Sequence, residues 1–259
     1  MLTPLTWRLW RALRSPEELN PLFERVQGQP VEMPGKKLLR PLQPVFHVLA
    51  VILPAILVVI APAALLLTAN LLGGLIAYNV MSTINREREQ RTYDLLALTP
   101  MGLGRANWLI AEACTYRLNA VDRLAQVRTL AIIMLVLVIF YLLRFSVLTL
   151  VVMVAVITAL NIDAIQSLIL GGLSGMLAQK FSEQGAPYAA LAIFAFIQII
   201  LVYLPITALG ILIYDLSHPT RRSVWTIYTV IALVVLVLIF LWREIIIQII
   251  WRALEKRLL

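Results

Sequence analysis

The sequence predicts an all-α integral membrane protein with about six transmembrane helices. Residues of the apolar set AVILMFWYC make up 61% of the 259 residues, charged residues make up only 14%, and the mean hydropathy is +0.89. These values lie far outside the usual range for a soluble domain. Several apolar runs reach the roughly 20 residues that a helix needs to cross a hydrocarbon core about 30 Å thick. They lack the alternating polarity of a membrane β-strand.

Residues 1–44 are expected to form a cytoplasmic segment that consists of amphipathic helices and a linker. The first helix would carry Trp7, Arg8, Trp10, Arg11 and Arg14. Rings and guanidinium groups at this spacing suit a helix that lies on the membrane, with its charges toward anionic lipid. The alternative is a poorly ordered basic tail. Ser15 and Pro16 favour a second short helix that ends near Val26, and prolines and glycines between residues 28 and 44 predict a linker.

Residues 45–259 are expected to form the transmembrane domain, and its first two spans share one uncharged run. Residues 45–84 contain no Asp, Glu, Lys or Arg and would be about 60 Å long as one straight helix. Two spans therefore fit better, with a turn near residues 60–62. Asn70 and Asn79 lie in the second span, where their expected role is to hydrogen-bond across helices.

Four further spans follow a polar helix that is expected to run from residue 106 to residue 128. The predicted spans are 129–143, 145–178, 186–214 with a kink at Pro205, and 224–242 before a basic terminus. Residues 145–178 could be one bent span or two helices. Gly171 and Gly175 have the GxxxG spacing that lets a neighbouring helix approach closely, so a packing face is expected there.

The distribution of basic residues predicts the orientation. The segment before residue 45 and the loop 85–128 each contain seven Lys or Arg. Basic loops favour the cytoplasmic side, and an even number of spans returns the C-terminus to that side. Both termini are therefore expected in the cytoplasm.

The loop 85–105 is the most charge-dense part of the chain and is predicted to be a docking device. Its first charges alternate in sign, a small apolar patch follows, and a Thr-Pro pair ends the helix. A short helix of this kind, joined directly to two spans, is suited to a groove in a soluble partner. The alternative is a solvated face on which Glu87 and Glu89 pair with Arg91 and its neighbours.

This loop resembles the type 2 ABC exporter permeases, which carry the pattern ERE-x-G-T-x-(E/D)-x-L-x-x-TP after their second span. The matching residues are Glu87, Arg88, Glu89, Thr92, Asp94, Leu96, Thr99 and Pro100, and Arg86 precedes them. Residues 20–25 and the small-residue helix 170–174 are also similar to segments of that family. One position differs, since Arg91 stands where the family usually has glycine.

The resemblance implies a permease subunit in the plasma membrane of a prokaryotic cell. It would pair with a second permease subunit, either a copy of itself or a paralogue, and with two cytosolic ABC ATPases that dock on residues 86–100. The chain contains no G-x-x-x-x-G-K-[ST] phosphate loop. We therefore expect it to bind no cofactor itself, with ATP and Mg²⁺ on the partner. Membrane topology accounts for the net charge of +8, so no nucleic-acid partner is expected.

Asp163 is the only acidic residue inside the apolar runs and supports a different reading. An intramembrane carboxylate is costly to bury and is often functional, so Asp163 and Asn161 are candidates for a substrate or ion path. Asp163 could also pair with Arg144. Two other classes of protein stay open: an intramembrane enzyme centred on Asp163, and a non-transporting anchor that recruits a cytosolic complex. One cysteine and two histidines predict no metal site.

Overall fold

The computed structural model confirms an all-helical fold over the residues that it describes. These are residues 4–14, 21–28, 43–93, 102–142, 147–181, 185–204, 207 and 224–258. The regular elements in these ranges are helices, and none is a strand. Residues 29–42 of the predicted linker, residues 94–101 of the loop and the predicted kink at Pro205 lie outside the described residues.

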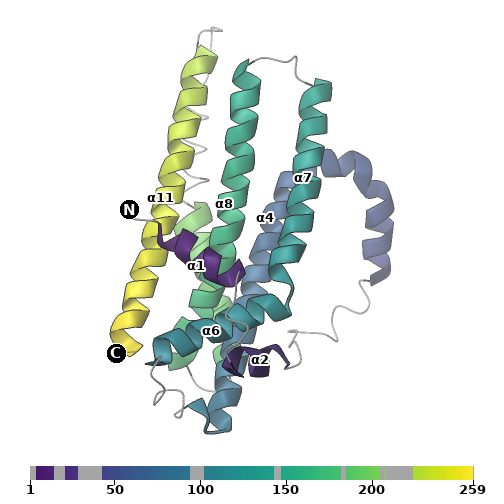
Figure 1. Cartoon of the computed structure of the whole chain (residues 1–259). Coiled ribbons are helices and arrows are strands. Elements are labelled where there is room, and N and C mark those ends of the chain that lie inside the picture. The colour runs from purple at the N-terminus through teal and green to yellow at the C-terminus, as the bar shows by residue number, and fades with distance from the viewer. Residues whose placement is uncertain are drawn as a thin grey trace.

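The longest helix, α4 (Gln43–Glu89), contains both of the first two predicted spans. At the predicted turn near residues 60–62 the helical structure is not interrupted, since it continues through Pro62. As a straight rod, 47 residues would measure about 70 Å. Figure 1 shows instead that the first part of the ribbon curves over and joins the part labelled α4 running the other way. Prolines inside helices bend them by removing one hydrogen bond.

The polar helix expected over residues 106–128 is two helices. α6 (Gly102–Arg117) ends at a corner, and α7 (Ala120–Leu142) carries the polar residues 122–128 straight into the apolar run. At the corner Asn119 has a positive φ of 48°. This conformation ends the helix, and asparagine tolerates it better than most residues.

The later predicted spans are also helical, and the last helix is longer than the predicted span. α8 (Val147–Leu177) is one helix, extended by a short 3₁₀ turn, η2 (Ala178–Lys180). α9 (Ala186–Phe196) continues into a π-helical segment, η3 (Ile197–Tyr203). The predicted last span and basic terminus form a single helix, α11 (Val224–Leu258).

Small residues bring α4 and α8 close together at the centre of the fold. A Cβ on Gly171 would lie 2.3 Å from the carbonyl oxygen of Gly73, and one on Gly175 would lie 2.7 Å from the Cβ of Val80. No side chain fits at these points without moving a helix. Gly171 and Gly175 therefore lie where α8 packs on α4. Asn70 extends the contacts of α4 to η3, because its amide donates to the Tyr203 hydroxyl at 2.5 Å.

Two short helices cover one side of this bundle. α1 (Leu5–Arg14) runs across the long helices, and α2 (Pro21–Gln27) lies next to α6 (Figure 1). Leu9 and Leu13 of α1 are buried, whereas Trp7 is half exposed. The hydroxyl of Thr6 donates to the Glu244 carboxylate, which ties α1 to α11. α1 is therefore a packed amphipathic helix and not a disordered tail.

Two helices in the described part of the chain are long and apolar enough to cross a membrane. They are Leu65–Glu89 in α4 and Ile157–Leu177 in α8, and a shorter apolar helix covers Ala186–Ile200. The two long segments fall in the second and fourth predicted spans. The other four spans and the orientation stay predictions.

Candidate functional site

The predicted docking loop begins with the C-terminal end of α4. Residues 86–89 form the last turn of that helix, so the expectation that they open a separate short helix is wrong. The chain then turns at Arg91, whose φ is +56°. The Arg91 amide donates to the Arg88 carbonyl at 2.9 Å, and the Thr92 amide donates to the Glu87 carbonyl at 3.0 Å. This pair of bonds around a left-handed residue is the Schellman motif, which satisfies the last carbonyls of a helix.

Glu87 is turned into the protein and is fully buried. The Thr92 hydroxyl donates to its carboxylate at 2.5 Å. Arg25, from α2, places a guanidinium nitrogen 3.4 Å from the same carboxylate oxygen and also donates to the Gln90 side chain at 2.6 Å. Glu87 therefore fixes the shape of the turn and joins it to α2.

Arg88 also has partners within the protein. Its guanidinium donates to the Gln179 carbonyl at 3.1 Å and lies 5.0 Å from the centre of the Tyr93 ring, within the range of a cation–π contact. The Tyr93 hydroxyl donates to Asn107 of α6 at 3.1 Å. The end of α4 is thus held by α6 and η2 as well as by α2.

The exposed charges of this turn are Arg86, Glu89 and Arg91. No hydrogen bond or ion pair joins any of these three side chains to another described residue. Four residues of the predicted docking surface lie outside the described residues: Asp94, Leu96, Thr99 and Pro100. The described part of the loop therefore divides into buried or partly buried residues that set its shape and three exposed charges, two basic and one acidic.

A second arginine holds the C-terminal end of α2 in place. Arg117, the last residue of α6, donates to the Val26 carbonyl at 3.2 Å and to the Asn79 side chain at 2.9 Å. It thereby joins the C-terminal end of α2 to α4. Asn79 hydrogen-bonds across helices, as expected.

Asp163 belongs to a buried polar network between α8, η3 and α11. It pairs with Arg243, which is fully buried and also donates to the Asp163 carbonyl at 3.1 Å. The second guanidinium nitrogen donates to Ser167 at 3.3 Å and to Gln198. Gln198 in turn donates to Ser167 at 2.9 Å. The Asp163 carboxylate is therefore paired with the last helix, and Arg144 lies outside the described residues.

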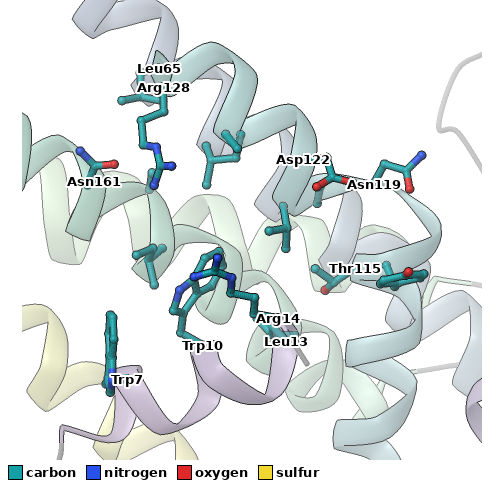
Figure 2. Close-up of a pocket in the computed structure, with 17 residues that line it drawn as sticks. Trp7, Trp10, Leu13, Arg14, Leu65, Thr115, Asn119, Asp122, Arg128 and Asn161 are labelled. Carbon is teal, nitrogen blue, oxygen red and sulfur yellow. The ribbon is translucent and has the colours of Figure 1, made fainter. Parts of the chain in front are cut away.

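Asn161 lies away from this network and lines a cavity of about 420 Å³ between α1, α4, α6, α7 and α8. Positions two apart on a helix point to nearly opposite faces, which explains why Asn161 and Asp163 do not form one site. Figure 2 shows Trp7, Trp10 and Arg14 of α1 on one side of the cavity and Arg128 on the other. Asn161 donates to the Ile157 carbonyl at 2.6 Å.

The sequence interpretation did not single out the cations that organise both regions. Arg243 was assigned to the basic terminus, although it follows an uncharged run from residue 223 to residue 242 and precedes another apolar stretch. A lone arginine inside an apolar helix is the signal that could have identified it. No local signal pairs Arg25 with Glu87, because the two residues lie far apart in the sequence.

These observations define a helical protein with two potential membrane-crossing helices, a buried ion pair between α8 and α11, and a braced, charged turn at the end of α4. Comparisons with protein-family models, with characterised proteins and with solved structures gave no match.

Proposed function

We propose that this chain is the transmembrane permease subunit of a type 2 ABC exporter, in which the end of α4 couples the spans to a cytosolic ATPase. The observation that carries the proposal is the backbone at Arg91, whose φ is +56°. This position corresponds to the glycine of the family pattern, and glycine is the residue that takes a left-handed conformation most readily. The left-handed backbone at this position is one that a glycine would favour, and this supports the resemblance although the residue differs.

The division between buried and exposed charges suits a docking role. Glu87 and Thr92 hold the turn together from inside, whereas Arg86 and Glu89 present opposite charges to solvent. In this proposal Arg86 and Glu89 contact the ATPase, together with Asp94, Leu96, Thr99 and Pro100. Charged residues at the edge of an interface set its register and reject wrong partners.

The same geometry supplies a route for movement. α4 is continuous from Leu65 to Glu89, and its end is anchored to α2, α6 and η2. A partner that shifts this end moves α4, and with it the helices that pack on it, α7, α8 and α9. Six spans, a second permease subunit and cytoplasmic termini belong to the proposal. ATP and Mg²⁺ would be held by the partner.

Co-purification in mild detergent from the native host tests the proposal. We expect an ABC ATPase to accompany the wild-type chain and to be lost from the charge reversal Arg86→Glu/Glu89→Lys. The matched control is Arg252→Glu/Glu255→Lys on α11, which reverses two exposed charges at the same three-residue spacing.

Equal recovery of the ATPase with both double variants would remove Arg86 and Glu89 from the interface. Absence of any ATPase from the wild-type preparation would overturn the exporter assignment. An ATPase that binds, but whose hydrolysis rate is the same with and without this chain in liposomes, would identify a recruiting anchor instead.

A further inference from the structure

The cavity beside α1 has an apolar wall that matches the hydrocarbon part of a lipid. Trp7 and Trp10 of α1, Leu65 of α4 and Ile165 of α8 line it. Trp10 and Ile165 are partly buried, and Leu65 is 2% exposed. Its volume of about 420 Å³ lies within the range of small-molecule sites. It holds a headgroup and the adjoining carbons more readily than a whole phospholipid.

Two arginines enter the same cavity from different helices. Figure 2 shows Arg14, on α1, and Arg128, on α7, directed into it from opposite walls. Neither guanidinium has a hydrogen bond or ion pair with another residue in the described part of the chain. One acidic residue, Asp122, also lines the cavity, and Figure 2 shows its carboxylate well separated from both guanidinium groups. With two arginines and one aspartate, the lining carries a net charge of +1. An anion between the two arginines would relieve their mutual repulsion.

The position of these residues along the chain places them at the level of lipid headgroups. Arg128 is the last charged residue before the uncharged run 129–143. Trp7 is 50% exposed, and exposed tryptophans concentrate where hydrocarbon meets water. An amphipathic helix with arginines and tryptophans lies at the same boundary.

We propose that this cavity binds the headgroup of an anionic phospholipid drawn from the membrane. The phosphate lies between Arg14 and Arg128, and the glycerol and first acyl carbons lie against Trp7, Trp10 and Leu65. Arginine suits phosphate because its planar guanidinium donates two parallel hydrogen bonds. This site is separate from the turn at the end of α4 and does not depend on an ATPase partner.

Native mass spectrometry of the full-length chain, released from detergent, tests the proposal. We expect phosphatidylglycerol to remain bound more tightly than phosphatidylcholine with the same acyl chains. Arg14→Gln and Arg128→Gln should each weaken retention of phosphatidylglycerol about fivefold, the usual contribution of one arginine near an anionic surface. The matched controls are Arg8→Gln and Arg11→Gln, which change exposed arginines of α1 outside the cavity lining and should leave retention unchanged.

A cavity-filling variant tests the apolar half of the site. Ala125 lines the cavity, so Ala125→Phe should abolish specific retention while both arginines remain. Each variant is first compared with wild type by thermal unfolding in lipid-free detergent, and only variants that match wild type are scored. Equal retention of the two lipids, or equal losses with the Arg8 and Arg11 variants, would overturn the proposal. The proposal would also be overturned if inorganic phosphate protected the protein against thermal unfolding as strongly as phosphatidylglycerol does. The site would then recognise an anion and not a lipid.

Discussion

Replacing Arg91 by glycine should make the protein more stable, although Arg91 lies in the most charged part of the chain. Its left-handed backbone (φ +56°) costs an ordinary L-residue about 1–2 kcal/mol. Glycine removes that cost but gains about 0.4–1 kcal/mol of conformational freedom in the unfolded chain. We therefore expect the free energy of unfolding to increase by about 0.5–1 kcal/mol, which corresponds to an increase in unfolding temperature of about 1–4 °C.

Thermal unfolding in one detergent, followed by circular dichroism, measures the effect. Arg91→Ala is the matched control, because it removes the charge and keeps the Cβ that makes the conformation costly. We expect Arg91→Gly to exceed Arg91→Ala in stability. Asn119→Gly gives a second comparison at φ +48°, where the gain should be smaller because asparagine tolerates this conformation. If Arg91→Gly is no more stable than Arg91→Ala, the turn is not left-handed and the main support for the proposed function fails.

Three further substitutions test the packing and the buried charges by thermal unfolding or proteolysis. Gly171→Ala should destabilise the protein by about 1–3 kcal/mol through overpacking, whereas Gly172→Ala, whose Cβ would lie 3.4 Å from its nearest neighbour, should be neutral or stabilising. Equal effects would refute the close approach of α8 to α4. Arg243→Met should lower the stability of the protein by about 3–5 kcal/mol, because it leaves the Asp163 carboxylate buried and unpaired. Adding Asp163→Leu should recover much of that loss, and a double variant with no recovery would rule out the pairing. Glu87→Ala should cost about 1–3 kcal/mol by removing a buried acceptor and should speed tryptic cleavage at the end of α4, and an unchanged rate would contradict its role in the turn.

Run lengths and charge gaps were enough to predict the helical class, because each long apolar run must satisfy its backbone internally. They were not enough to place every helix end. A turn between two separate helices was predicted near Pro62, yet a proline removes one hydrogen bond and can bend a helix without ending it. The corner at Asn119 has no glycine or proline, so its only signal is a single asparagine. Helix ends of this kind depend on how the neighbouring helices pack.

The turn at the end of α4 was predictable only in its local part. The motif from Glu87 to Thr92 identified the segment, but the sequence could not show that Glu87 faces inward while Glu89 faces outward. That distinction depends on Arg25, which reaches Glu87 from α2. The cavity beside α1 could not be predicted from the sequence either, because its two arginines come from helices that meet only in the folded protein.

One helix touches both proposed sites, and this places a constraint on them. Leu65 lines the cavity beside α1, and the proposed docking turn follows Glu89, about 36 Å further along the same helix. If α4 transmits force from an ATPase, it also transmits any shift caused by lipid at its other end. Coupling between two binding sites is reciprocal, so the factor by which phosphatidylglycerol changes ATPase affinity must equal the factor by which the ATPase changes lipid affinity. If neither ligand changes the affinity of the other, α4 carries no signal between the sites, even if both sites bind their ligands.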